Sequence, residues 1–161
     1  MSRSTLILAA ALVAALAFAP PARAAPGLNG FERQVIAQLN DARAQHGLAP
    51  LRAYRPLNRA ADRHSRDMLR SDFFDHPSSD GTPFDRRVRR FANASVIGET
   101  LAALPQRRGG ADMVVQLWLD SAVHRDIVLG TGFRRIGVAR RWGSLGNAQN
   151  AVVTADFASG D

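Results

Sequence analysis

Residues 133–157 decide the fold class, and they consist of two apolar-rich segments, Phe133-Arg-Arg-Ile-Gly-Val-Ala-Arg-Arg141 and Ala151-Val-Val-Thr-Ala-Asp-Phe157, joined by Trp142 to Asn150. The first segment predicts a strand, because Ile136 and Val138 alternate onto one face. The second predicts another strand, because β-branched and aromatic residues favour that state. The glycine- and asparagine-containing residues 143–150 predict a turn between them. We therefore expect the chain to end in an antiparallel β-hairpin.

The part of the chain before this hairpin carries apolar residues at helical spacing. Phe31, Val35 and Leu39 recur four residues apart, and Gly47 ends the pattern, which predicts a helix over residues 31–46. The remaining patterns predict helices from Pro56 to Met68, over 84–91 and over 111–122, with a further helical turn or two at 124–129. They also predict an ordered loop at 73–83 and short extended segments at 48–51 and 96–97. Helices first and a hairpin last indicate the α+β class, with helices packed on a small antiparallel sheet.

The first 24 residues are organised like a secretory signal peptide. Arg3 precedes an uncharged apolar run from Leu6 to Phe18, and the small-residue pattern Ala22-Arg-Ala24 follows two prolines. The run is shorter than the roughly 20 residues that span a bilayer, which favours a cleaved signal over an uncleaved membrane anchor. We expect cleavage after Ala24, no transmembrane segment afterwards, a single domain over residues 25–161, and a secreted or periplasmic location.

The composition narrows the partners of this domain. All 21 basic residues are arginine, against 14 acidic residues, and there is no cysteine. A domain of this size can build its core without disulfides. Guanidinium groups bind phosphate and carboxylate groups bidentately, so an exported arginine-rich domain suits anionic lipid or an anionic envelope glycan, although a modest positive charge also serves solubility alone. Nucleic acid is not expected, because no basic stripe is interleaved with aromatic residues.

Two of the four histidines have simple structural interpretations. His46 ends the first predicted helix, where a basic side chain favours the negative end of the helix dipole. His64 lies on the apolar stripe of the second helix, which predicts a core histidine satisfied by one hydrogen bond.

His76, Glu99 and His124 are the candidate site residues. Neither histidine position requires this residue for packing, and Glu99 lies between apolar segments, where a carboxylate must be paired, protonated or bound to metal. Two histidines and a carboxylate can hold Zn²⁺ or another divalent cation. The same groups can also perform general acid–base catalysis. Their separations of 23 and 25 residues are not a metal motif by themselves.

A serine hydrolase is the other chemistry considered. Ser121 lies three residues before His124, and Ser65 follows His64. The chain has no G-x-S-x-G elbow, and no predicted strand leads either serine into a sharp turn. A phosphate-binding glycine loop is also missing from the sequence, so no nucleotide cofactor is expected.

Six segments in order along the chain resemble the CAP superfamily (cysteine-rich secretory proteins, antigen 5 and pathogenesis-related 1), in its short, cysteine-free bacterial secreted branch. They are Leu39-Asn-Asp-Ala-Arg43 with Gly47-Leu-Ala-Pro-Leu51; Ala61-Asp-Arg-His-Ser-Arg-Asp-Met68; Phe74-Asp-His76 with Gly81 and Phe84-Asp-Arg86; Ile97-Gly-Glu99 with Leu101-Ala102; Trp118-Leu-Asp-Ser121 with His124-Arg125 and Leu129; and Phe133-Arg-Arg-Ile-Gly-Val138. The resemblance implies an α-β-α sandwich with a cleft at one end. It also implies that His76, Glu99 and His124 meet there.

One departure from the family pattern bears on chemistry. Larger CAP proteins carry a second glutamate three residues after the tryptophan, and this chain has Ser121 there, beside Asp120. Serine cannot replace a carboxylate as a base, and Asp120 is turned by about 100° along a helix. The resemblance therefore implies an incomplete four-residue site, which argues against a two-carboxylate mechanism.

Three functions remain open on these grounds. The first is an extracellular binding module, whose cleft holds a divalent cation through His76, His124 and Glu99 and whose surface binds lipid or envelope polysaccharide. The second is a metal-assisted hydrolase, with Glu99 as general base and Ser121 positioning the substrate. The third is a structural or effector protein without catalysis, in which these residues only brace the fold.

Overall fold

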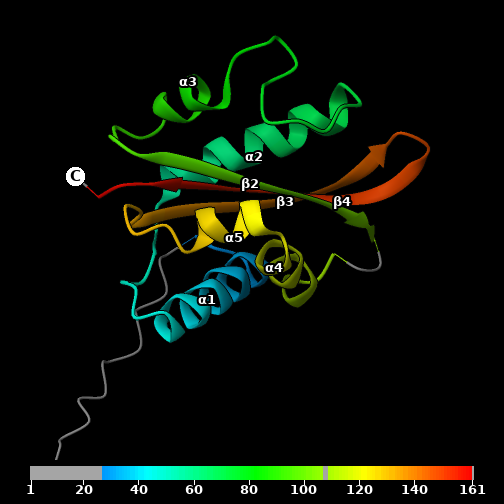
Figure 1. Cartoon of the computed structure of the whole chain (residues 1–161). Coiled ribbons are helices and arrows are strands. Elements are labelled where there is room, and N and C mark those ends of the chain that lie inside the picture. The colour runs from blue at the N-terminus through cyan, green and yellow to red at the C-terminus, as the bar shows by residue number, and fades with distance from the viewer. Residues whose placement is uncertain (1–26, 107–108, 161) are drawn as a thin grey trace, which may run out of the picture.

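The computed structural model describes residues 27–106 and 109–160. It has three layers, with a sheet between helices on its two faces (Figure 1). Helices α2 (Arg55–Arg70) and α3 (Phe84–Arg89) lie on one side. Helices α1 (Gly30–Gln45), α4 (Ala111–Asp120) and α5 (Ala122–Val128) lie on the other. This α-β-α sandwich confirms the expected α+β class, and each helix lies close to its predicted position.

The described residues form a four-stranded sheet in the order β1-β3-β4-β2. Strands β2 (Ile97–Pro105), β3 (Arg135–Leu145) and β4 (Ala148–Ala158) are antiparallel, with β4 in the middle. The two-residue strand β1 (Arg52–Ala53) pairs with β3 in parallel. The predicted C-terminal hairpin is therefore the centre of the sheet, which is antiparallel except at this one edge.

The strands are longer than the sequence predicted. The hairpin turn was expected over residues 143–150, but Leu145 already pairs with Ala148 across a two-residue connection. Gly146 has a φ of +59°, the left-handed conformation that tight hairpin turns require. β2 was expected only at residues 96–97, because its one glycine and two alanines have weak strand propensity. Pairing with β4 along its whole length forms the strand despite that composition.

Helix α2 packs unusually close to the sheet at Gly137. A Cβ atom at this glycine would lie 2.1 Å from the carbonyl carbon of Leu57 and 2.2 Å from the backbone nitrogen of Asn58. The Asn58 side chain donates a hydrogen bond to the carbonyl of Val138 at 2.8 Å. Only glycine permits this approach, which fixes α2 and the residues that it carries against β3.

The face toward α1 and α4 is apolar. Trp118 of α4 is fully buried there, and its indole N–H donates to the carbonyl of Leu101 in β2 at 2.9 Å. The same cluster includes Val35 and Leu39 from α1, Ile136 and Val138 from β3, and Val153, Ala155 and Phe157 from β4. This cluster is the main core of the protein.

The face toward α2 and α3 is only partly apolar. Leu57 and Met68 of α2 centre two smaller clusters on this face. Ser65 and Thr154 are bonded to each other there, with their hydroxyl oxygens 2.9 Å apart. Polar side chains thus enter the layer beneath α2, and the candidate site develops from them.

Within residues 27–106 and 109–160, none of the helices has the length and apolar character needed to cross a bilayer. The predicted signal peptide, residues 1–24, lies outside the described residues.

Candidate functional site

The loop between α2 and α3 carries His76 and is anchored at several points. Asp67 of α2 accepts hydrogen bonds from the backbone and the hydroxyl of Ser79, at 2.9 and 2.8 Å. His64 is 1% exposed, and its Nε2–H donates to the carbonyl of Asp75 at 2.9 Å. These contacts confirm the prediction of an ordered loop and of a core histidine at position 64. They hold the residue next to His76 against α2.

His76 and Glu99 form a direct pair. The carboxylate of Glu99 is 2% exposed and accepts a hydrogen bond from Nδ1–H of His76 at 2.8 Å. Nη2 of Arg87, from α3, donates to the other carboxylate oxygen at 2.5 Å and to the carbonyl of His76 at 3.2 Å. Both oxygens of Glu99 are therefore engaged. The carboxylate holds His76 in the tautomer that leaves Nε2 with its lone pair.

This pairing shifts the titration of His76. The hydrogen bond to Glu99 raises the pKa of His76 above 6.5, against the opposing effect of partial burial. The side chain is 44% exposed, so it can meet a ligand from solvent. Its ring also lies 6.1 Å from that of Phe84, the first residue of α3.

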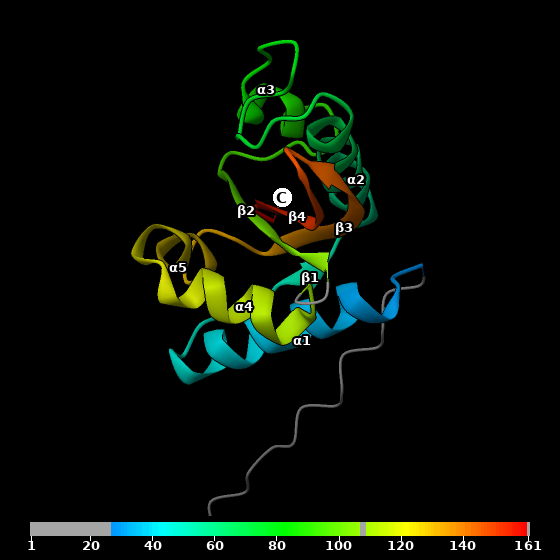
Figure 2. The same ribbon diagram turned by 90° about the vertical axis from the view of Figure 1, so that its right-hand side faces the viewer.

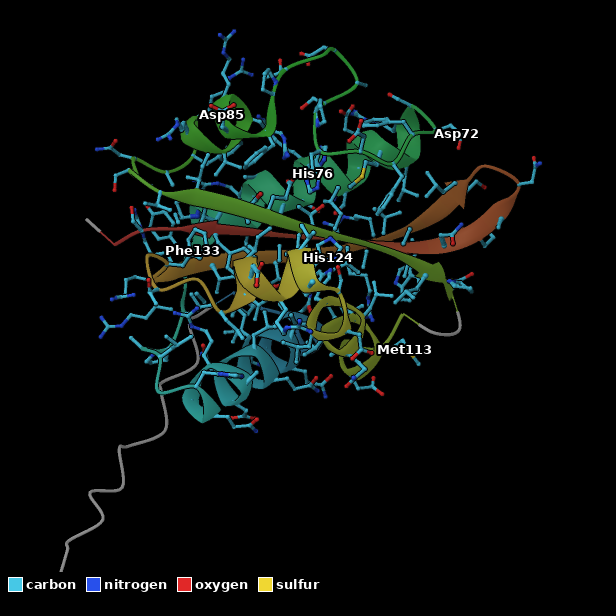
Figure 3. The ribbon with its side chains drawn as sticks, viewed as in Figure 1. Asp72, His76, Asp85, Met113, His124 and Phe133 are labelled. Carbon is cyan, nitrogen blue, oxygen red and sulfur yellow. The ribbon has the colours of Figure 1, made fainter. Side chains whose placement is uncertain are left out.

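His124 approaches from the opposite side of the sheet. It lies on α5, and Figure 3 shows it below the β2 ribbon, with His76 above. Burial lowers the pKa of His124, and the charge of His76 lowers it further. Nδ1 of His124 is buried without a partner among the described residues. The neutral imidazole thus has an unsatisfied nitrogen, which is unusual for a buried polar atom.

Arg43 positions the segment that follows α5. This arginine of α1 is fully buried, and its Nη1 donates to the carbonyls of Val128 and Gly130, at 2.6 and 3.0 Å. Its Nε donates to the carbonyl of Ala49 at 2.9 Å. A buried cation that binds three carbonyls fixes the end of α5, and with it the helix that carries His124.

Asp156 of β4 is a second carboxyl group beside Glu99, directly opposite it in the strand pairing. Burial raises the pKa of Asp156 well above 3.8, and the neighbouring charge of Glu99 raises it further. Neither of its oxygens accepts a hydrogen bond from the described residues. Burial and the neighbouring charge of Glu99 therefore both favour the protonated form of Asp156.

Neither candidate for the missing second glutamate has a recorded hydrogen bond to His76, Glu99 or His124 among the described residues. Asp120 is exposed and accepts from the amide of Gln116 at 2.8 Å. Ser121 separates α4 from α5 with an extended backbone, and its side chain caps neither helix. Ser65, the other serine considered, is buried against Thr154. The carboxyl group next to Glu99 comes instead from Asp156, on a different element.

The three-ligand metal site predicted from the sequence is not formed by the described residues. They contain no group of three or more His, Asp or Glu side chains placed to hold a metal ion together. Glu99 bonds to His76 rather than presenting a free oxygen. A histidine whose other nitrogen donates to a carboxylate is nevertheless the usual form of a metal-binding histidine. Glu99 is thus placed to orient His76 rather than to offer a free oxygen of its own.

Sequence reasoning found His76, Glu99 and His124 but missed Arg87, Asp156 and Arg43. A signal for Asp156 was present, because strict alternation along Ala151–Phe157 places it on the face opposite Phe157. Arg87 is one of four arginines in residues 86–90. Nothing in the sequence indicates which of the four is buried against Glu99.

The comparison with protein families agrees with this arrangement. Residues 36–157 match the model of the cysteine-rich secretory protein family, CAP. The chain belongs to this family. It is a CAP domain without cysteine, of the type found in bacterial extracellular proteins.

Two proteins of Bacillus subtilis (strain 168) are similar in sequence. The uncharacterized protein YkwD is 31% identical over 112 residues, which cover 69% of this chain and 42% of YkwD. The uncharacterized membrane protein YlbC is 31% identical over 108 residues, which cover 66% of this chain and 30% of YlbC. The chain therefore spans less than half the length of these curated relatives.

Solved CAP structures are similar in fold. An extracellular protein of Bacillus anthracis with an SCP domain has a TM-score of 0.70 and 26% identity, over 82% of this chain and 41% of that one. An outer surface protein of Borrelia burgdorferi has a TM-score of 0.66 and 18% identity, over 80% of this chain and 92% of that one. The second likeness concerns the fold alone.

Proposed function

We propose that this CAP domain is an extracellular binding module that holds a divalent cation, most suitably Zn²⁺, between His76 and His124. Its wider surface binds an envelope polysaccharide or lipid. The observation that carries the metal proposal is the hydrogen bond between His76 and Glu99, which orients Nε2 of His76 as a ligand. Export is supported by the signal-like sequence of residues 1–24 and by the extracellular relatives.

The state of His124 supports the same proposal. Its pKa is lowered, so the imidazole is neutral near pH 7 and can donate a lone pair to a metal. Its buried Nδ1 has no partner among the described residues, so a ligand would satisfy it at no cost in existing bonds. Arg43 fixes the segment that follows this helix.

Binding over catalysis is supported by the condition of Glu99. A general base needs a free carboxylate oxygen within reach of the proton that it abstracts. Both oxygens of Glu99 are bonded to His76 and Arg87. The group is therefore better placed to orient His76 than to activate water.

Calorimetric titration of the purified protein with Zn²⁺ at pH 7.5 tests the proposal. We expect binding at one site, lost in His76→Ala/His124→Ala and retained in His46→Ala, which removes an exposed imidazole at the end of α1. Glu99→Gln should weaken binding about 10–100-fold, because it removes the carboxylate behind the ligand. Binding that survives in the double variant would overturn the proposal.

The pH dependence supplies a second criterion. Protons compete with the metal for imidazole nitrogen. Because the pKa of His76 is raised above 6.5, Zn²⁺ affinity should already fall as the pH is lowered from 7.5 to 6. An affinity that is constant over this range would exclude His76 as a ligand.

A further inference from the structure

A pocket of about 590 Å³ lies between α2, the loop after it and α3. Both views place these elements on the far side of the sheet from α5 and His124 (Figures 1 and 2). The charged residues lining the pocket are predominantly basic: Arg63, Arg66, Arg70, Arg87 and Arg90, against Asp67 and Asp80. The lining thus favours a negatively charged ligand.

Two of the lining side chains are buried and incompletely bonded. Arg87 is 7% exposed, and its Nε and Nη1 are buried without partners among the described residues, although Nη2 binds Glu99. His64 donates to Asp75 through Nε2–H, so its buried Nδ1 carries a lone pair and offers no donor to an anion. Unpaired buried donors are costly, and those of an arginine especially so. An anion that accepts from Arg87 would remove that cost.

The two acidic residues of the pocket are outnumbered by its five arginines. Asp67 accepts two hydrogen bonds from Ser79 and pairs with Arg70 at 3.8 Å, and Asp80 accepts one hydrogen bond from the backbone of Thr82. The guanidinium of Arg63 lies 5.5 Å from the centre of the Phe91 ring. Arg90, the residue after α3, is exposed and also lines the pocket. Arg63 and Arg90 can therefore turn toward a ligand without breaking an ion pair with these two aspartates.

We propose that this pocket binds the phosphate group of a sugar phosphate through the buried Arg87 and the exposed Arg63 and Arg90. A phosphate offers three acceptor oxygens and up to two charges, which suits several arginines better than one carboxylate does. The volume lies within the range of about 300–1,000 Å³ typical of small-molecule sites, so it has room for a sugar ring beside the phosphate. Phe91 and the Ser78 hydroxyl supply an apolar surface and a polar contact for that ring.

This inference rests on the proposed function for its choice of ligand, because a phosphorylated carbohydrate is one form of anionic envelope glycan. It does not depend on the metal. The pocket and the His76 pair share only Arg87, which contacts Glu99 through Nη2 and whose Nε and Nη1 have no partners among the described residues.

The test is calorimetric titration with glucose 6-phosphate, inorganic phosphate and glucose at 0.15 M salt. We expect one site for glucose 6-phosphate, weaker binding of inorganic phosphate, and none of glucose. Arg63→Gln/Arg90→Gln should weaken binding about tenfold or more, since each change removes a charge-assisted contact. Arg59→Gln/Arg86→Gln is the matched control, because it removes the same charge from exposed positions on the same two helices outside the pocket.

Two outcomes would overturn the proposal: no binding of glucose 6-phosphate by the unsubstituted protein, or an equal loss in both double variants, which would indicate only a general charge effect. A separate Zn²⁺ titration distinguishes this failure from that of the metal site. Zn²⁺ binding without sugar phosphate binding would exclude the pocket and leave the proposed metal site standing. Sugar phosphate binding without Zn²⁺ binding would exclude the proposed metal site and leave the pocket proposal standing.

Discussion

The two faces of the sheet hold their helices by different means, although both are built from the same strands. Toward α1 and α4, β4 presents Val153, Ala155 and Phe157, all fully buried in one apolar cluster. Toward α2 and α3, the same strand presents Thr154 and Asp156 between Val152 and Ala158. One face is stabilised mainly by apolar burial, whereas the other contains buried polar groups, of which some are paired and some have no partner among the described residues.

The apolar face therefore contributes mainly to stability, and the polar face carries the residues of the candidate site. On the apolar face a buried polar group needs partners, as Arg43 has in the carbonyls that it binds, because an unpaired group would cost more than the packing gains. The polar face holds Glu99, Arg87 and His64 in a low-dielectric layer, where burial lowers the pKa of His64 and raises that of Asp156. His76 and the arginine pocket both depend on that layer. The comparison can therefore be tested by truncating a buried side chain on the apolar face and by removing a buried charge on the polar face.

The largest effect is expected on the apolar face, from Trp118→Ala. Trp118 is fully buried, and removal of its ring leaves a cavity and an unpaired carbonyl at Leu101. We expect the free energy of unfolding to fall by about 4 kcal/mol, measured by urea denaturation followed by circular dichroism. Trp142→Ala is the matched control, because Trp142 is 44% exposed and stacks on Arg140, and it should cost under about 1 kcal/mol. Equal losses would contradict the assignment of the core to this face.

A somewhat smaller effect is expected on the polar face, from Arg87→Met. This change keeps the length of the side chain but removes the cation between Glu99 and the pocket. Breaking a buried pair leaves one charge uncompensated, at a cost of about 3 kcal/mol in the same denaturation experiment. The control Arg86→Met lies next to it on the exposed side of α3 and should change stability by no more than about 0.5 kcal/mol. If both variants were equally stable, Arg87 would have no structural role beneath α3.

The fold was largely readable from the sequence because its signals are local. Helical spacing predicted α1 and α2 to within two residues of their ends, and β-branched residues located β3 and β4. β2 was mostly missed, since residues 98–104 become a strand only through pairing with β4. The close contact of Gly137 with α2 was equally hidden, because it depends on two elements that are far apart in sequence.

The candidate site was readable only in part. His76 and Glu99 could be singled out because each residue type was unusual for its surroundings, and the structure brings them to 2.8 Å. The charge pattern was less informative. The composition predicted an arginine-rich domain but not where its arginines meet. The pocket takes three arginines one or two helical turns apart on α2, Arg87 from α3 and Arg90 just after α3. Gathering of this kind depends on helix geometry and on the loop that closes over it.

The smallest effect, and one of opposite sign, is expected from Asp156→Asn. The pKa of Asp156 is raised above 3.8 in the folded protein, so its contribution to stability is fully present below that pH and is lost as the pH rises toward the folded-state pKa. Asparagine keeps the shape and a donor toward Glu99 but does not titrate. The free energy of unfolding of the variant should therefore match that of the unsubstituted protein within about 0.5 kcal/mol near pH 4, and exceed it as the pH is raised to 8.

Urea denaturation at several pH values checks this prediction, with the exposed Asp41→Asn of α1 as the control for loss of one charge. A variant that instead loses stability with rising pH would mean that Asp156 is ionised and paired in the folded state, and the polar face would then hold two charged carboxylates rather than one.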